Sequence, residues 1–145
     1  MTEYIPSTRQ WVRDQVELYE ASGGKQGTTL RDTGLPVVIV THTGRKTGAI
    51  RKTPLMRVVA EDGTYALVGS KGGAPEHPDW YFSLRAQSEV TIRDGERVFQ
   101  ARIHEVTNPA ERERLWSAAV KAYPPYAEYQ QRTTRLIPVF AAEPI

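Results

Sequence analysis

The run Val37-Val-Ile-Val40 is the feature that most restricts how this chain can fold. Its four consecutive β-branched residues place apolar side chains on both faces of an extended segment. Such a segment is stable only where both of its faces are covered, as in a barrel or in a sheet packed on two sides. We therefore predict an inner strand over residues 37–43.

Further strand-like segments follow at short intervals. Their apolar content and the turn residues between them predict strands over residues 53–60, 64–70, 90–93, 97–106 and 136–141. The turn Glu61-Asp-Gly63 joins two of these segments, so we expect the first three strands to form a meander. Pro54 cannot donate a ladder hydrogen bond, which predicts that the second strand begins irregularly or lies at a sheet edge.

Helical segments are expected before, between and after these strands: residues 7–20, 80–86, 109–122 and a short helix after the proline pair 124–125. Ser7, Asp79 and Asn108 are the expected N-caps, because their side chains can accept hydrogen bonds from free N–H groups. Helices do not alternate regularly with strands, which disfavours a doubly wound sheet. The predicted fold class is α+β, with six mostly antiparallel strands in a barrel or curved sheet and with flanking and inserted helices.

Length and composition fit one domain with an N-terminal extension. A chain of 145 residues with 39% hydrophobic content can form a single packed core. Residues 1–33 are expected to form an amphipathic helix and a flexible connector, since residues 23–36 are rich in Gly and Thr and lack periodicity. Residues 34–145 are expected to form the β-barrel domain. We expect the helix to dock on this domain, with contact to a membrane surface or a role as a lid as the alternatives.

Residue types exclude several classes of site. The chain has no cysteine, which excludes thiol enzymes and thiolate zinc sites. The histidines at positions 42, 77 and 104 lack the spacing of a metal-binding pair, so we predict structural roles for them and no metal site. No apolar run approaches the ~20 residues of a membrane span, and a cytoplasmic protein is expected. The net charge is only +2, so any strong cationic field must be local.

Cationic residues gather at two glycine-containing turns. Gly44-Arg-Lys-Thr-Gly48 is followed by Arg51 and Lys52, and Ser70-Lys-Gly-Gly73 follows the third predicted strand. Glycine lets backbone N–H groups approach an anion closely, although each motif alone is more often a plain hairpin turn. In a meander the end of the third strand returns toward Arg51. We therefore expect Lys71 to meet the first cluster and to complete an anion site.

Aromatic residues form a second group. Tyr123, Tyr126 and Tyr129 follow one another at intervals of three around the proline pair. Three phenols on one side predict a pocket wall with an apolar body and polar tips. The run Trp80-Tyr-Phe82 offers more ring surface, and placements in the core and in the pocket are equally supported. A cationic mouth beside an aromatic floor suits a large anionic ring cofactor.

These stretches together resemble the deazaflavin-dependent nitroreductase family of actinobacteria. Members of that family have a split β-barrel fold similar to that of FMN-binding barrels, and they use coenzyme F420, an 8-hydroxy-5-deazaflavin. The resemblance covers residues 34–144 and rests on motifs in the same order: Gly44-Arg-Lys-Thr-Gly48, Arg51, Pro54-Leu55, Ser70-Lys-Gly-Gly73, Pro78 with Trp80-Tyr81, Tyr123-Pro-x-Tyr126-x-x-Tyr129 and Ile137-Pro138.

The resemblance implies a set of site residues and makes residues 34–145 a cofactor-binding domain. The phosphate and oligoglutamyl tail of F420 would be held by Arg45, Lys46, Arg51 and Lys71. The other implied cofactor-binding positions are Thr47, Gly48, Pro54, Met56, Ser70, Gly72, Gly73 and Trp80. The substrate pocket would be bordered by Tyr123, Tyr126, Tyr129, Met56 and Trp80. Lys52 matches no such position and is expected to face solvent.

The implied reaction is hydride transfer from reduced F420 to an electron-poor acceptor: a conjugated enone, a coumarin-like lactone, a quinone or a nitroaromatic compound. Tyr129 and Tyr126 are the first candidates for the catalytic group that polarises or protonates the acceptor, and Ser70 is the next. Met56 stands where the nitroreductases carry a tyrosine, which favours ene-type reduction over nitroimidazole activation. An F420-reducing dehydrogenase would supply the reduced cofactor. The protein would be a monomer or weak dimer, with peripheral contact to the inner membrane face as an alternative to a purely cytoplasmic location.

Other functions remain open. An FMN-dependent oxidoreductase could use the same barrel, although four basic positions fit a polyanionic tail better than a single phosphate. A carrier or sensor could bind F420 without turning it over. A nucleic-acid-binding module is disfavoured, and no nucleic-acid partner is expected, because the tyrosines follow a proline pair on a helix and do not lie on strands.

Overall fold

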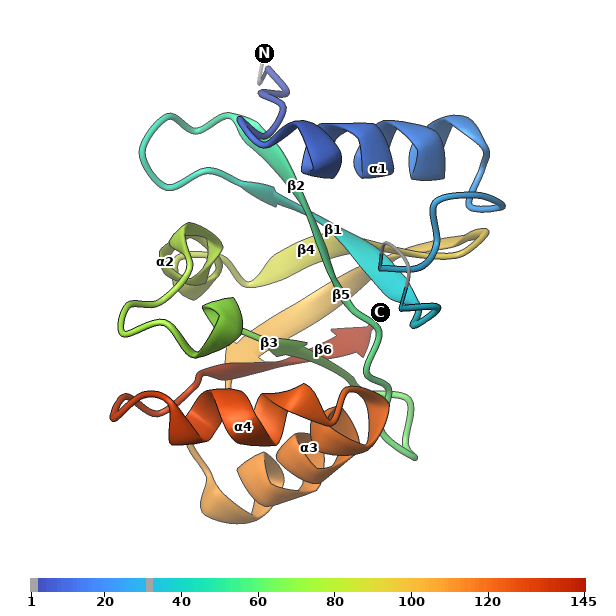
Figure 1. Cartoon of the computed structure of the whole chain (residues 1–145). Coiled ribbons are helices and arrows are strands. Elements are labelled where there is room, and N and C mark those ends of the chain that lie inside the picture. The colour runs from blue at the N-terminus through green and yellow to red at the C-terminus, as the bar shows by residue number, and fades with distance from the viewer. Residues whose placement is uncertain (1–2, 31–32) are drawn as a thin grey trace.

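The computed structural model describes residues 3–30 and 33–145 (Figure 1). Residues 31–32 of the predicted connector lie outside the described residues. The elements, in chain order, are α1 (Gln10–Ala21), β1 (Val37–Thr43), β2 (Ile50–Met56), β3 (Tyr65–Val68), the 3₁₀ helix η1 (Lys71–Gly73), α2 (Asp79–Arg85), β4 (Glu89–Asp94), β5 (Arg97–Glu105), α3 (Pro109–Ala122), α4 (Pro125–Gln131) and β6 (Val139–Pro144). The helix α1 lies at one end of the molecule and α3 and α4 lie at the other, with the strands between them (Figure 1).

All six strands join one antiparallel sheet in the order β2-β1-β4-β5-β6-β3. The run Val37–Val40 behaves as its composition predicts, because its side chains alternate between two hydrophobic clusters. Val37 and Ile39 join the cluster that includes α1 and α3, and Val38 and Val40 join the cluster that includes α2. The predicted α+β fold, a six-stranded antiparallel split β-barrel with flanking and inserted helices, is confirmed.

The predicted meander of the first three strands is wrong, because β3 pairs with β6 and not with β2. After β2 the chain forms a short hairpin, in which Ala60 N–H donates to Thr64 O (2.8 Å) and Ala66 N–H donates to Val58 O (3.0 Å). This hairpin carries β3 to the other edge of the sheet. The edge strands β2 and β3 do not pair along their lengths, and this gap splits the barrel.

The strand β2 lies at a sheet edge, as Pro54 predicted. Pro54 stands opposite Ile39, and the missing N–H is tolerated because, among the described residues, no second strand pairs along the other side of β2. The strand begins at Ile50, before its predicted start at Thr53, because pairing with β1 resumes directly after the turn. It ends at Met56, where the chain turns into the short hairpin.

Helix α1 packs on the barrel through Val12, Val16 and Tyr19, which are buried. The phenol of Tyr19 is fully buried, donates to Val37 O (3.0 Å) and accepts from Gly95 N–H (2.7 Å). Both hydrogen-bonding roles of this buried hydroxyl are therefore satisfied by the barrel backbone. These contacts fix α1 over β1 and the β4–β5 turn.

The predicted helix caps are correct only at α3, where Asn108 Oδ1 accepts from the N–H groups of Ala110 (3.0 Å) and Glu111 (3.1 Å). Ser7 is not the N-cap of α1. Arg9 takes that position, and Ser7 Oγ accepts from its N–H (3.1 Å) in the preceding turn. Asp79 is already the first residue of α2 and lies in its first turn, where its charge suits the helix dipole.

The last strand begins later than predicted, at Val139 and not at Leu136. Pro138 has no N–H to donate to a ladder. The N–H of Ile137 donates to Gln130 Oε1 (2.9 Å), so this residue is held by the end of α4. Pairing with β3 and β5 therefore starts only after the proline and extends to Pro144.

Candidate functional site

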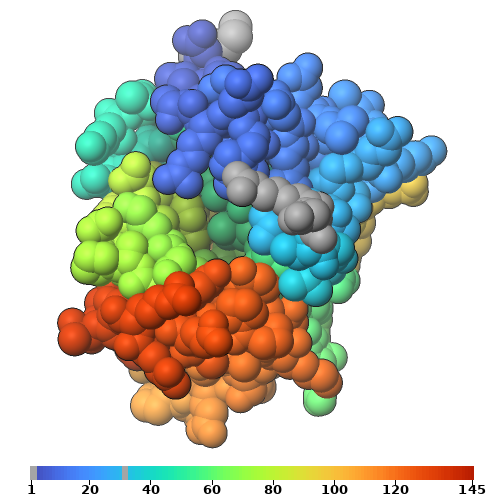
Figure 2. Space-filling model, viewed as in Figure 1, coloured from blue at the N-terminus to red at the C-terminus, as the bar shows by residue number. Residues whose placement is uncertain are grey.

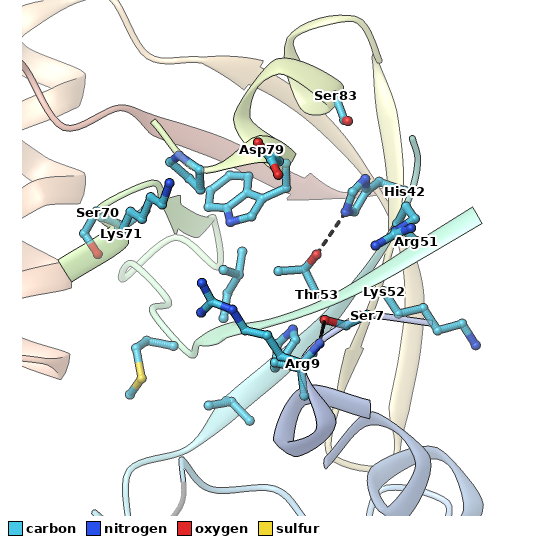
Figure 3. Close-up of a pocket in the computed structure, with 18 of the residues that line it drawn as sticks. Ser7, Arg9, His42, Arg51, Lys52, Thr53, Ser70, Lys71, Asp79 and Ser83 are labelled. Atoms are coloured by element: carbon cyan, nitrogen blue, oxygen red, sulfur yellow. Dashed lines mark hydrogen bonds between the residues drawn. The ribbon is translucent and has the colours of Figure 1, made fainter. Parts of the chain in front are cut away.

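A cavity of about 900 Å³ lies between α1, the β1–β2 hairpin, the η1–α2 segment and the C-terminal helices. In the space-filling view it opens as a hollow between α1 above and α3 and α4 below (Figure 2). Figure 3 shows that its polar lining comes from segments far apart in sequence, including Arg9 before α1, Arg51 on β2, Lys71 in η1 and Asp79 at the start of α2. The split of the barrel therefore coincides with a large binding space.

The charge of this lining is strongly one-sided. Within the described residues the cavity has a single carboxylate, Asp79, and six cationic side chains: Arg9, Arg45, Lys46, Arg51, Lys52 and Lys71. Lys46 and Arg51 form no ion pair within residues 3–30 and 33–145. Unpaired cations that share one concave surface create a local positive potential that attracts anions. The charge of the cavity therefore favours an anionic ligand over a cationic one.

The turn between β1 and β2 holds two of these cations and is anchored on α2. Gly48 has φ +70°, a region that favours glycine, and its N–H donates to Gly44 O (2.9 Å). The N–H of Arg45 donates to Ser83 Oγ (3.1 Å), and the Arg45 guanidinium lies 5.0 Å from the centroid of the Phe82 ring. A stacked guanidinium keeps its hydrogen-bond donors free at the ring edge.

The second glycine turn follows β3 and places Lys71 in the same cavity as Arg51. The convergence expected from the sequence is therefore present, although the meander given as its reason is wrong. Lys71 has φ +45°, which is uncommon for a residue with a side chain, and its Nζ lies 3.3 Å from Glu76 Oε1. That carboxylate is exposed, so the ion pair is weak and can open for a ligand.

Lys52 does not face solvent as predicted. Its Nζ binds Glu20 Oε1 of α1 at 2.6 Å and lies 4.8 Å from the centroid of the Tyr4 ring. In Figure 3 its side chain extends away from Ser70 and Lys71. Lys52 is therefore a tether between β2 and the N-terminal segment, a contact that no local sequence pattern predicts because its partner is 32 residues away.

The three tyrosines form one cluster at the α3–α4 junction. Their ring centroids are 4.9 to 6.3 Å apart, and the Tyr123 and Tyr129 hydroxyls are 2.9 Å apart in a hydrogen bond. Burial, and then the bond to Tyr129, raises the pKa of Tyr123 to about 12. Burial also raises the pKa of Tyr126 far above its ordinary value. These two phenols are neutral at pH 7 and can donate hydrogen bonds to a ligand oxygen.

Most residues that the sequence assigned to cofactor or substrate line this cavity: Arg45, Lys46, Thr47, Arg51, Pro54, Met56, Ser70, Lys71, Gly72, Trp80, Tyr123, Tyr126 and Tyr129. Gly48 and Gly73 do not line it. Gly48 shapes its turn through its positive φ. Gly73 packs against α4, where an added Cβ would lie 2.7 Å from Tyr129 O.

Sequence reasoning missed several lining residues, chiefly Ser7, Arg9, Trp11, His42, Thr53 and Ser83. The sequence predicts a separate helix and connector for residues 1–33, yet Arg9 and Trp11 complete one wall of the cavity. Figure 3 shows the Arg9 side chain extending into it. A cation that precedes an amphipathic helix was the only available signal.

His42 lies on the cavity wall, where it is 6% exposed and its Nε2 is 3.0 Å from Thr53 Oγ1. Burial lowers its pKa to about 4, with a smaller contribution from the charge of Arg51. The unfolded chain binds a proton at His42 below pH ~6.5, whereas the folded chain binds it only near the lowered pKa. The free energy of unfolding should therefore fall as the pH drops from ~6.5 to ~4, by up to about 3 kcal/mol from this residue.

Urea unfolding at neutral and acidic pH checks this prediction, with His42→Gln as the comparison. The glutamine amide reaches the position of Nε2, so it can keep a hydrogen bond to Thr53, but it does not titrate. The variant should lose less stability than the wild-type protein between pH ~6.5 and ~4.5, since carboxylates and the other histidines titrate equally in both. Equal losses in the two proteins would contradict the prediction.

Fold and site together define a class of protein: a split β-barrel with a cationic and aromatic cavity whose lining suits an anionic ring cofactor. Residues 11–144 match the model of one family, the F420H(2)-dependent quinone reductases. The chain belongs to this family.

Individual relatives agree with this assignment. The chain is 36% identical to an F420H(2)-dependent quinone reductase of Mycobacterium tuberculosis strain H37Rv. The alignment spans 134 residues and covers 90% of this chain and 87% of the relative. A solved structure described as a domain-swapped dimer is 48% identical, with a TM-score of 0.71, and covers 94% of this chain and 100% of that one. A structure described as an F420-H2 dependent reductase is 52% identical, with a TM-score of 0.68, and covers 74% of this chain and 94% of that one.

The chain is therefore an oxidoreductase that transfers a hydride from reduced coenzyme F420 to an electron-poor acceptor. The cofactor predicted from the sequence, F420, is confirmed at the level of the family. The residues of this cavity fit such a cofactor, because cations without carboxylate partners meet flat aromatic side chains there. Among the helices that the structure describes, none has the length and apolar character needed to cross a bilayer.

Proposed function

We propose that the cavity binds reduced F420 beside a quinone and that this chain reduces the quinone there. The observation that carries the proposal is the pairing of a cationic end with an aromatic wall in one space of about 900 Å³. The family description and the mycobacterial relative support a quinone as the acceptor. Ene-type reduction of enones and coumarins, which Met56 favours, and nitro reduction stay predictions for the same site.

Cofactor binding is assigned to side chains on three walls. Arg45, Lys46, Arg51 and Lys71 would hold the phosphate and the carboxylates of the tail, because guanidinium and ammonium groups form strong charge-assisted hydrogen bonds to both. Ser70, Gly72 and their backbone would approach the ring from the second glycine turn. Thr47, Pro54, Met56 and Trp80 complete the lining, while Gly48 and Gly73 act on the shape of their turns.

Acceptor activation is assigned to the tyrosine cluster. Bound F420H2 supplies the hydride, and the protein supplies placement and a hydrogen-bond donor. Tyr129 would donate to a carbonyl oxygen of the quinone, which gains negative charge as the hydride arrives. Tyr123 would donate in turn to Tyr129, because their hydroxyls are 2.9 Å apart. Tyr126 and Ser70 are the next candidates for this role.

Two assays test the proposal. Loss of the absorbance of reduced F420 on mixing with menadione should require the protein, and no turnover over a panel of quinones, enones and nitroaromatics would indicate a carrier or sensor. Binding of F420 and FMN to the purified protein should favour F420, because a polyanionic tail can engage more of the cations than one phosphate. Tighter binding of FMN would overturn the cofactor assignment for this cavity.

Replacement of Lys46 with alanine should weaken F420 binding by about 1–3 kcal/mol, as expected for one charge-assisted contact. The loss should shrink at high salt, because mobile ions screen the attraction. A fluorescence titration at low and high salt measures both effects. Lys121→Ala is the matched control, since it removes the same charge from an exposed position outside the cavity. If Lys46→Ala binds F420 as tightly as Lys121→Ala does, the β1–β2 turn does not contact the cofactor.

Replacement of Tyr129 with phenylalanine should lower kcat for menadione by about tenfold, which corresponds to the loss of one hydrogen bond of about 1.4 kcal/mol. The F420 affinity should stay the same. Tyr123→Phe should have a smaller effect on kcat, since Tyr129 could still donate to the acceptor. If Tyr123→Phe lowers kcat more than Tyr129→Phe, the two roles are reversed.

We infer that the protein depends on an F420-reducing dehydrogenase, because each turnover consumes reduced cofactor. A cytoplasmic location follows from that supply, and contact of the first helix with the inner membrane face is the alternative. Leu18, which is exposed, lies in that helix, and exposed Ile5 precedes it. Co-sedimentation with anionic vesicles that Leu18→Glu abolishes would support the contact. Sedimentation velocity would show whether the protein is a monomer or a weak dimer.

A further inference from the structure

We propose that Arg135 is a positioning residue that sets the conformation of the second glycine turn, residues 69–74, for cofactor binding. The inference rests on the proposed function and adds a residue that does not line the cavity itself. Arg135 lies between α4 and β6 and reaches the outer side of the turn.

Every nitrogen of the Arg135 guanidinium is used at this turn. Nε donates to Ala74 O (2.9 Å), Nη1 donates to Gly69 O (3.2 Å), and Nη2 donates to Ser70 O (2.7 Å). Nη1 also lies 2.9 Å from His77 Nδ1. A planar fork that binds three carbonyls of a six-residue turn fixes their relative positions, which an ammonium group on a flexible stem cannot do.

The backbone of the turn needs such support. Ser70 is right-handed helical (φ −74°, ψ −38°), whereas Lys71, Gly72 and Gly73 have φ values of 45°, 64° and 81°. A right-handed residue followed by left-handed ones turns successive N–H groups to one side, an arrangement that forms an anion-binding concavity. A residue with a side chain keeps a left-handed conformation only where its surroundings hold it there. Lys71 is such a residue.

The donor and acceptor sides of the turn are separated. The N–H groups of Ser70, Lys71 and Gly72 have no hydrogen-bond partner within residues 3–30 and 33–145. The carbonyls of Gly69 and Ser70 are held by Arg135 on the other side. Binding of the carbonyls therefore leaves the N–H groups and the Lys71 side chain to the cavity, where an anionic ligand would meet them.

The packing around Arg135 makes this arrangement rigid. The ring of His77, next to Nη1, stacks on Tyr81 with centroids 4.2 Å apart, and Tyr81 is buried. The turn is also packed from the α4 side, where Gly73 leaves no room for a side chain. Arg135 thus joins the turn to α2 through His77.

The test compares Arg135→Gln with Arg132→Gln in the full-length protein. Both variants remove a cation near the turn, but in the part of the chain that the structure describes the Arg132 side chain forms one long hydrogen bond to it, Nη1 to Gly72 O at 3.5 Å. We expect Arg135→Gln to weaken F420 binding at least tenfold more than Arg132→Gln does. Arg135→Lys, which keeps the charge but not the fork, should fall between the wild-type protein and Arg135→Gln. Equal affinities of the two glutamine variants would overturn the proposal.

A positioning role also predicts coupling to Lys71. Lys71→Ala should cost less affinity in the Arg135→Gln background than in the wild-type background, because the turn then no longer presents the lysine. Hydrogen exchange of the cofactor-free protein should be faster in Arg135→Gln at Gly73 and Ala74, whose N–H groups donate to Ser70 O and Lys71 O, with unchanged exchange in β1. Additive affinity losses, or faster exchange throughout the barrel, would indicate a purely structural residue.

The two hypotheses fail separately in these experiments. If the wild-type protein binds no F420, the proposed function fails, and the exchange measurement still shows whether Arg135 orders the turn. If F420 binds and Arg135→Gln leaves both affinity and exchange unchanged, only the role of Arg135 is wrong. Where Arg135→Gln does not fold, the same comparisons apply to Arg135→Lys.

Discussion

Replacement of Gly73 with alanine should lower the free energy of unfolding by about 2–5 kcal/mol, a larger stability loss than at the neighbouring Gly72. Two costs add at this position. Gly73 has φ +81°, which is unfavourable for a residue with a Cβ, and the new Cβ would lie 2.7 Å from Tyr129 O and 3.0 Å from Tyr129 Cα. These atoms are helix backbone, so α4 must move to make room. Urea unfolding measures the loss.

Gly72→Ala is the matched control, because Gly72 has φ +64° but nothing within 4 Å of a new Cβ. Only the conformational cost of about 1–2 kcal/mol applies there. The difference between the two variants therefore isolates the close approach of the turn to α4. If both variants lose the same stability, the turn and the tyrosine helix are not packed as described. In a folded Gly73→Ala protein, a larger fall in kcat than in Gly72→Ala is also expected, since Tyr129 lies at the contact.

Removal of cations from both glycine turns should give the largest loss of cofactor affinity. The double variant Lys46→Ala/Lys71→Ala is expected to weaken F420 binding by about 2–6 kcal/mol, because each lysine contributes about 1–3 kcal/mol and they lie on different turns. The effect should grow at low salt, where exposed charges are screened least. Fluorescence titration of F420 measures it, and the protein should stay folded because both lysines have exposed side chains.

Lys25→Ala/Lys121→Ala removes the same total charge from exposed positions outside the cavity. If the lysines act only by long-range attraction, the two double variants should bind F420 with equal affinity. If they contact the cofactor directly, Lys46→Ala/Lys71→Ala should bind F420 much more weakly. A double variant that loses no more affinity than Lys46→Ala alone would show that the tail of F420 reaches only the β1–β2 turn.

The sheet order could not be predicted from neighbouring segments, although the strands could. The two apolar faces of Val37–Val40 predict an inner strand, and the missing N–H of Pro54 predicts an edge strand. Both predictions are correct. The pairing of β3 with β6 depends on two segments about 70 residues apart, and no property of residues 64–70 indicates it. The observed start of β6 differs from the predicted one for a similar reason, because the N–H of Ile137 donates to the side chain of Gln130 on α4.

The candidate site was easier to predict where chemistry is local. The cations lie within the two glycine turns, and the spacing of the three tyrosines is visible in the sequence, so most of the predicted residues do line the cavity. Lys52 was misplaced because its partner Glu20 lies on a helix that the sequence does not connect to β2. Arg9 and Trp11 were missed for the same reason. All three errors arise because α1 packs against the barrel, and no local sequence pattern indicates that contact.

The position of α1 has a consequence for how this protein could diverge. The cations of the two turns and the tyrosine cluster all come after residue 43, whereas one wall of the same cavity comes from Ser7 to Val12. That wall is held mainly by the buried face of α1 and by the Lys52–Glu20 ion pair. Substitutions that shift α1 would therefore reshape this wall without changing any residue of the two glycine turns or of the tyrosine cluster.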